Sequence, residues 1–479
     1  MSASVEVLLQ KIFSVTTENI NLVFGGPQEI SCLMENWFSR SSEETNVVQD
    51  IRQELEKLKG SLSNIQAVSQ DNLRLQDKAV IVTLWLQKLS DLADDADNAL
   101  AEFGYQILQH EVEMLNQEKP KVSLFSCHSD KKAFRQEMMP KARGISNKLE
   151  MINKEVKDFL ASEKYGVTTV SSPQVDVVQE VGFLIADLKI TENEEKTSIE
   201  NFWSIIKEKA GVSDEIPIGL KDIGRHIAEK CQGLSLAANL LGGLLQNKRR
   251  DFWLSILESG VLDKEDVISA ILKLCFENLP TPFLKRCFAF CSMFPRNSVI
   301  ERDQLVQLWM AEGFIDPGLG ISVMEEIGNQ YFDTLLQNSL LEIVSKDNFN
   351  NVTHCKMHNL VYDFAYSLSS FESITFCESD QDDIRQIQHL ALESFTEETM
   401  KIAKEKATYL RTLFLKNNLP DNNLLNVNFL YVLNLCDADI AELPASIGKL
   451  RHLEYLDLSR TKIKSIPDSA CNLYKLKTL

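Results

Sequence analysis

Apolar residues recur at helical spacing along most of the chain before residue 370. This spacing predicts amphipathic helices, because residues three and four positions apart lie on one face of an α-helix. The most regular seam alternates steps of four and three and consists of Trp85, Leu89, Leu92, Ala96, Ala99 and Phe103. Such a heptad pattern is typical of helices that pack side by side. Together with neighbouring amphipathic stretches, it predicts a four-helix bundle over residues 1–165.

Residues 271–315 form the densest apolar stretch and predict a buried helical hub. A helix rich in phenylalanine and cysteine ends before Pro295, and a second helix is predicted from near Ile300 until Gly313 stops it. A further helix is predicted over residues 323–341, and the runs LLEIV and VTHCKM then surround the polar turn KDNFNN. Helices followed by such a hairpin predict a winged helix.

The C-terminal part of the chain is a repeat. The segments YLRTLFL, FLYVLNL and HLEYLDL share one pattern, and Leu433, Leu456 and Leu479 follow one another at a constant interval. This interval of 23 residues is typical of leucine-rich repeats, in which alternating leucines form a short strand. The last repeat stops without a capping sequence, so we expect residues after about 430 to be the least stable part of the fold.

Three segments resemble the coiled-coil-type NLR immune receptors of plants (nucleotide-binding, leucine-rich-repeat proteins). CFAFCSMFP followed by QLWMAEGF resembles their ARC2 winged-helix block, and IGRHIAEKCQGLSLAANLLGGLL resembles their ARC1 helices. WLQKLSDLADDADNALAEFGY resembles their acidic EDVID-type motif, which docks on the leucine-rich repeats. The resemblance implies a mainly α, multidomain protein that ends in a short α/β leucine-rich-repeat solenoid. The implied parts are a coiled-coil domain (1–165), a linker (166–198), an ARC1-like domain (199–265), an ARC2-like domain (266–370), a connector (371–405) and partial repeats (406–479).

Within the EDVID-type motif, Asp97 and Glu102 keep acidic positions, whereas Asn98 and Ala101 stand where the family usually has acids. The resemblance implies that Asp97 and Glu102 contact the repeats or a partner. A solvated acidic helix face remains the alternative interpretation.

The nucleotide-binding core of these receptors is missing from the sequence. A phosphate-binding loop needs the pattern G-x-x-x-x-G-K-[ST], and the chain contains none. Two residual family positions follow: Ser235 replaces the proline that packs against the nucleotide base, and His358 lies in Met-His-Asn where the family has Met-His-Asp. We expect no cofactor for this chain, although intact relatives bind ADP or ATP.

Charge and composition exclude several other functions. The net charge of -19 argues against a nucleic-acid surface, and the helix predicted at 301–312 carries Glu301, Asp303 and Glu312, which would repel phosphate. His354, Cys355 and His358 lack a fourth ligand at metal-binding spacing, so we expect no metal site. The ten cysteines show no regular spacing, which indicates reduced thiols in the cytoplasm. No segment predicts a signal peptide or a membrane span, and the amphipathic first helix is compatible with transient contact with the plasma membrane.

These features predict a truncated intracellular immune receptor that acts in plant defence through protein–protein interaction. The expected partners are full-length immune receptors, pathogen effectors or guarded host proteins. No residue is nominated as catalytic, and we expect no enzymatic activity. Two alternatives stay open at this point: a nucleotide switch whose core is supplied in trans, and a non-functional gene remnant.

Overall fold

A computed structural model describes residues 199–212, 218–231, 234–264, 266–315, 321–369, 373–375, 388–392, 409–416, 427 and 429–479. It also describes eight single helical residues: Asn98, Glu102, Tyr105, Pro140, Gly144, Asn147, Met151 and Lys154. The heptad seam, Asp97 and the linker at 166–198 lie outside the described residues. The chain divides into two compact bodies, one formed by residues 1–175, 311–320 and 376–479 and the other by residues 176–310 and 321–375.

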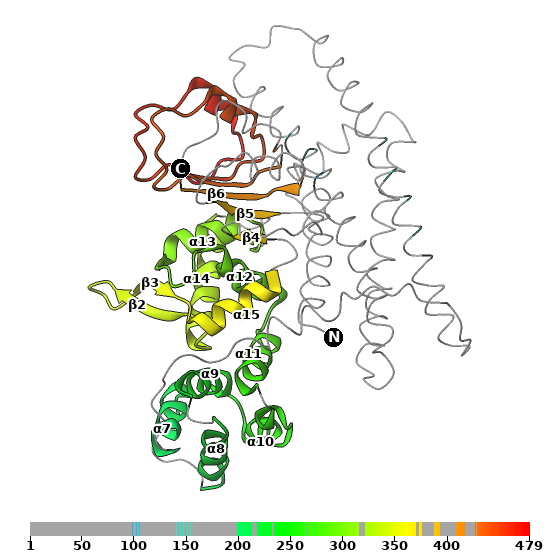
Figure 1. The fold of residues 1–479 in the computed structure, drawn as a ribbon, viewed down its shortest axis with the longest axis vertical. Coiled ribbons are helices and arrows are strands. Elements are labelled where there is room, and N and C mark those ends of the chain that lie inside the picture. The colour runs from blue at the N-terminus through cyan, green and yellow to red at the C-terminus, as the bar shows by residue number, and fades with distance from the viewer. Residues whose placement is uncertain are drawn as a thin grey trace. The chain divides into compact units, whose positions relative to one another are not determined.

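The second body begins with the helices expected from the ARC1-like segment (Figure 1). They are α7 (Ile199–Lys209), α8 (Ile218–Lys230), α9 (Ser235–Leu245) and α10 (Arg250–Glu258), followed by the 3₁₀ turn η1 (Val261–Asp263). α9 is apolar around almost its whole circumference, and nine of its 11 residues are buried. A helix of this composition is stable only inside a core. α9 is therefore the centre of this helical group, with α7 and α11 (Val267–Glu277) packed against it.

The winged-helix part follows the predicted hub closely. Its helices are α11, α12 (Pro282–Phe290), α13 (Arg302–Ala311), α14 (Ile321–Gln337) and α15 (Asn359–Ser369), and the 3₁₀ turn η2 (Cys291–Met293) follows α12. Thr281 caps α12 by accepting a hydrogen bond from the Leu284 amide at 3.1 Å, and Pro282 fits the first helical turn. Phe276, Phe288 and Phe364 come from three helices, and their ring centroids lie 6.0–6.2 Å apart. These rings form the centre of the hub.

The predicted hairpin is present, and it is joined by a strand that the sequence did not indicate. β2 (Glu342–Lys346) and β3 (Val352–Lys356) pair antiparallel, and the hairpin extends away from the helices (Figure 1). The helix predicted from near Ile300 begins only at Arg302, because Ile300–Glu301 forms β1 and pairs with β3. At the hairpin tip, Phe349 is 86% exposed.

The repeats form a parallel sheet whose register repeats the sequence interval. β5 (His389–Leu392), β6 (Thr412–Leu415), β7 (Val432–Asn434) and β8 (Tyr455–Asp457) follow one another in chain order, and Leu433 lies beside Leu456. The returning segments contain the 3₁₀ helices η4 (Ala445–Lys449) and η5 (Asp468–Asn472). The segment 371–405, expected to be a connector, contains β5 and the short strand β4 (Ser373–Thr375). The repeat sheet therefore begins before residue 406.

Glu312 differs from its expected position on an exposed helix face. It lies just after the end of α13 and is 1% exposed. Thr412 donates a hydrogen bond to its carboxylate, and the His389 and Arg411 side chains approach the same carboxylate at 3.8 and 3.9 Å. A buried carboxylate needs such partners, because its desolvation is costly. Glu312 is thus part of the core of the repeat body and offers no charge to a ligand, whereas Glu301 and Asp303 are exposed.

Candidate functional site

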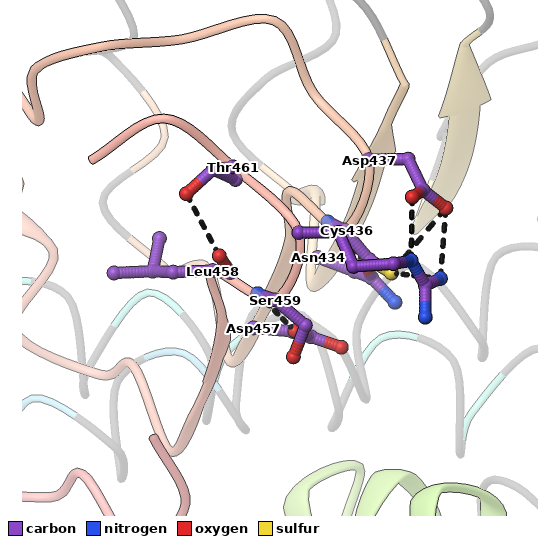
Figure 2. Close-up of polar contacts among 8 residues, drawn as sticks. Asn434, Cys436, Asp437, Asp457, Leu458, Ser459 and Thr461 are labelled. Carbon is purple, nitrogen blue, oxygen red and sulfur yellow. Dashed lines mark hydrogen bonds and ion pairs between the residues drawn. The ribbon is translucent and has the colours of Figure 1, made fainter.

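The repeats hold their polar side chains in the same way in successive turns. At the end of β7, the Asn434 side chain accepts a hydrogen bond from the Cys436 amide at 2.9 Å, and at the end of β8 the Asp457 carboxylate accepts one from the Ser459 amide at 2.8 Å (Figure 2). Asn434 and Asp457 are both buried. These short side chains fix the turn by bonding to the backbone two residues ahead. Each strand therefore ends at a defined position.

The next residues of both turns pair with each other. Asp437 and Arg460 have φ angles of 65° and 57°, a region that L-residues adopt rarely. The Arg460 guanidinium donates to the Asp437 carboxylate at 2.8 Å and to the Cys436 sulfur at 2.8 Å. The hydrogen bond from Arg460 lowers the pKa of Asp437, whereas burial, aided by the Asp457 carboxylate, raises the pKa of the Cys436 thiol to about 11.

Two further side-chain pairs connect adjacent repeats. Lys462 lies 2.5 Å from Asp439, and Lys477 lies 2.7 Å from Glu454. In each of these pairs the acid comes from the earlier repeat and the base from the later one. Charged pairs between neighbouring strands and turns support the stacking of the repeats.

An aromatic and basic group lies near the amino-terminal ends of the strands. His452 is 1% exposed, and its ring stacks on Phe429 with centroids 5.1 Å apart. Arg451 precedes it, and Asn472 and Tyr474 occupy the following repeat. We call Arg451, His452, Asn472 and Tyr474 the repeat slot.

Three residues of the EDVID-type segment are described, and two of them contact the repeat slot. Asn98, Glu102 and Tyr105 are helical and are separated by four and three positions, so they share one helix face. Glu102 lies 3.3 Å from His452 Nε2 and 3.7 Å from Arg451 Nη1. Its side chain keeps 22% of its surface exposed. These distances belong to an ion pair with Arg451 and a hydrogen bond with His452.

Tyr105 enters the slot more deeply than Glu102. It is 3% exposed, its ring stacks on Tyr474 with centroids 5.9 Å apart, and the Arg451 guanidinium lies 5.3 Å from its centroid. Its hydroxyl donates to the Asn472 carbonyl at 3.5 Å. His452 approaches the ring edge-on at 5.8 Å. Tyr105 was not singled out from the sequence, and neither were the slot residues. No pattern in the local sequence distinguished them from other residues that precede a repeat strand.

The two residual nucleotide positions lie in the other body. Ser235 is the first residue of α9, and its carbonyl accepts a hydrogen bond from the Asn239 side chain at 2.9 Å. His358 immediately precedes α15, and its Nδ1 accepts a hydrogen bond from the Leu360 amide at 3.2 Å. Asn359 Oδ1 is buried and has no hydrogen-bond partner among the described residues. His358 thus serves as a local cap of α15.

The histidine and cysteine residues near β3 have ordinary structural contacts. His354 Nδ1 lies 2.8 Å from the Ser345 hydroxyl, and Cys355 is fully buried. Within the described ranges, no group of three or more His, Cys, Asp or Glu side chains could hold a metal ion. In the same part of the chain, no helix combines the length and apolar character that a bilayer crossing requires.

Three family models match the chain in sequence. The Rx N-terminal domain matches residues 4–137, the disease resistance protein winged helix domain matches residues 293–365, and a leucine-rich repeat region matches residues 392–479. Among curated proteins, the putative disease resistance RPP13-like protein 1 of Arabidopsis thaliana is 32% identical over 283 residues. The chain thus combines an N-terminal domain, a winged helix and leucine-rich repeats that match those of plant disease resistance proteins of the coiled-coil NLR type.

Other relatives are also named disease resistance proteins. The disease resistance protein RGA2 of Solanum bulbocastanum is 33% identical over 295 residues, which cover 60% of this chain and 28% of the relative. The disease resistance protein RPM1 of A. thaliana is 31% identical over 244 residues, which cover 47% of this chain and 26% of the relative. The match to the RPP13-like protein covers 54% of this chain and 26% of that relative. The chain therefore spans only about a quarter of the length of these curated relatives.

Proposed function

We propose that this chain acts in plant defence through protein–protein interaction, with its N-terminal domain docked on its own repeats until a partner releases it. The observation that carries the proposal is the contact of Glu102 with Arg451 and His452. Docked in this way, the N-terminal helix face that includes Asn98, Glu102 and Tyr105 is unavailable to other proteins. Release would free it to associate with the same domain of an intact immune receptor.

The proposed partners are intact receptors, pathogen effectors or guarded host proteins, met in the cytoplasm or at the plasma membrane. Two of the matched family models support a role in interaction, because an N-terminal domain and repeats are kept together in one chain. Leucine-rich repeats build extended surfaces that suit protein ligands. The aromatic and basic repeat slot has the composition of such a surface, since Tyr, His and Arg supply both apolar contact and directed polar contact.

We further propose that the chain does not switch through its own ADP or ATP. Phosphate binding depends on backbone amides and a lysine of a Gly-Lys loop, and the sequence has no such pattern. The Nδ1 of His358 is already bonded to the Leu360 amide, and Ser235 offers one hydroxyl at the start of α9. These two groups supply far fewer hydrogen-bond donors than the phosphates of a nucleotide require.

A charge swap in the full-length chain tests the docking. The readout is the affinity for the purified N-terminal domain of an intact relative, measured by analytical ultracentrifugation. Glu102→Arg places two like charges together at Arg451, so we expect the docked state to open and the affinity for the added domain to rise about tenfold, which corresponds to about 1.4 kcal/mol. Arg451→Glu combined with Glu102→Arg restores the opposite charges and should return the affinity toward the wild-type value. Equal affinity for all three proteins would refute the docking.

Nucleotide binding is tested separately by isothermal titration of the purified chain with ADP and with ATP in the presence of Mg²⁺. We expect no saturable site at micromolar concentrations, because the loop that supplies most phosphate contacts is absent from the sequence. A stoichiometric heat change with a micromolar dissociation constant would overturn this part of the proposal and leave the docking untouched.

A further inference from the structure

The contact of the N-terminal segment with the repeat slot has a charged part, which is exposed to solvent, and an aromatic part, which is buried. The Arg451 side chain is 51% exposed and Glu102 is 22% exposed, at a separation of 3.7 Å. An ion pair that remains in contact with solvent is screened by salt and must also hold two flexible side chains in place. Glu102 therefore orients the contact more than it stabilises it.

Comparison with the EDVID-type motif also indicates that the charged part of the contact is weak. At Asn98 and Ala101 the chain lacks acids that the motif usually carries. Asn98 is half-buried and carries no charge. The electrostatic attraction between this helix face and Arg451 is thus weaker than the motif would suggest.

Tyr105 shows the opposite properties. It is 3% exposed and is contacted on several sides: by the Tyr474 ring, the Arg451 guanidinium and the edge of His452. Stacked and edge-to-face rings attract each other beyond the gain from burial, and a guanidinium over an aromatic face adds a further attraction. A tyrosine buried in a contact and flanked by the more exposed Glu102 and Arg451 has the pattern of an interface hot spot.

We infer that Tyr105 is the anchor residue of the docked N-terminal domain, and that the Arg451, His452 and Tyr474 side chains form the aromatic and cationic slot that recognises it. This inference rests on the proposed docking and names the residue that determines it. The partner segment that fits the slot is a helix that presents a tyrosine three positions after an acidic residue. Docking through this residue is largely insensitive to salt, because the buried ring carries no net charge.

Hydrogen exchange of the full-length chain measures the docking directly. The amides of Arg451, Leu453 and Leu473 donate hydrogen bonds within the repeats and lie at or beside the slot. We expect Tyr105→Ala to accelerate their exchange about tenfold or more, at both low and high salt, because truncation of an anchor residue removes most of the contact energy. Glu102→Gln should have a smaller effect that disappears at high salt.

Three further variants distinguish the loss of the Tyr105 contact from a general destabilisation of the fold. Tyr105→Phe keeps the ring and loses only a hydrogen bond of 3.5 Å, so its exchange should stay within about threefold of the wild type. Tyr474→Ala changes the slot from the repeat side, and its effect should not add to that of Tyr105→Ala in the double variant, because the two rings act as one contact. Phe349→Ala removes an exposed aromatic on the β2–β3 turn and should change none of these amides.

The outcomes distinguish the inference from the proposed docking. Faster exchange in Tyr105→Ala and Tyr474→Ala without additivity supports the anchor. Faster exchange in Glu102→Gln alone overturns the anchor and leaves an electrostatic docking. Unchanged exchange in every variant overturns both. Additive effects of Tyr105→Ala and Tyr474→Ala would mean that the rings do not form one contact, and they too would overturn the inference.

Discussion

Gly243 in α9 lies where this helix closely approaches the end of α14. A methyl group added at this position would lie 2.5 Å from the Gln337 carbonyl oxygen and 2.7 Å from Asn338 Cα, at the end of α14. Ordinary contact begins at 3.4 Å, so the methyl group needs about 0.9 Å more room. Both neighbours are backbone atoms, so they can move only if the end of α14 shifts as a whole. Glycine at this point therefore allows α9 to pack against the end of α14.

The expected cost of Gly243→Ala follows from two opposing terms. Overpacking of a well-packed core costs about 1–3 kcal/mol. Alanine is favoured over glycine inside a helix by about 1 kcal/mol, which offsets part of that cost. Because both neighbours are backbone atoms, the upper part of the overpacking range applies, about 2–3 kcal/mol, which leaves a net loss of about 1–2 kcal/mol in the free energy of opening. This loss corresponds to amide exchange in α9 and α14 that is about 5–30 times faster.

Gly219→Ala is a matched control for this experiment. Gly219 lies in the first turn of α8, and an added methyl group would meet the flexible Arg250 guanidinium at 3.3 Å, which can move aside. Exchange in α8 should therefore stay unchanged or become slower. The reasoning fails if Gly243→Ala leaves exchange in α9 and α14 within about twofold of the wild type, or if both variants change it equally.

Two other predictions follow from the repeats. At pH 8, iodoacetamide should label exposed Cys471 well before Cys436, whose thiol has a pKa of about 11. Labelling of Cys436 should become faster between pH 8 and pH 10, because its thiolate fraction grows. Peptide mass spectra measure both rates, and equal rates at pH 8 would contradict this prediction. Leu433→Ala should lower the stability of the repeats by about 2–5 kcal/mol, because it leaves a cavity in the core. Asp439→Asn should lower it by less than about 1 kcal/mol, because the ion pair of Asp439 with Lys462 is exposed. Denaturation followed by hydrogen exchange in the repeat strands measures both, and a larger loss for Asp439→Asn would reverse the ranking of burial over charge.

Helices and strands that show a clear hydrophobic pattern within one segment were predictable from the sequence. The run that contains Phe288 and ends before Pro295 forms α12 and η2, and the alternating runs around KDNFNN form β2 and β3. Both depend on periodicity within one segment. β1 was not predictable, because a strand of two residues has no periodicity, and its partner β3 lies about fifty residues further along the chain.

Only the N-terminal half of the candidate site could be predicted from the sequence. The acidic segment drew attention to Glu102, yet its partners Arg451 and His452 lie some 350 residues away. Nothing in the local sequence distinguishes these two from other polar residues that precede a repeat strand. Tyr105 was missed for a similar reason, since a single tyrosine on an amphipathic helix is compatible with an ordinary core position. Glu312 shows the reverse error: its charge suggested an exposed position, but buried partners from β5 and the start of β6 hold it in the core.

The pairing of Asp437 with Arg460 and of Asp439 with Lys462 bears on how such a solenoid can change in evolution. Tandem duplication is the simplest way to lengthen a repeat array. A copy of the turn that carries Asp437 and Asp439, inserted directly behind the original, would set carboxylate beside carboxylate at both positions, and like charges facing each other across strands are unfavourable. Duplicating the acidic and the basic turn together would instead keep every pair matched. A duplication that keeps these pairs matched must therefore copy two repeats at a time, and exchanging the order of the two repeats would break the match.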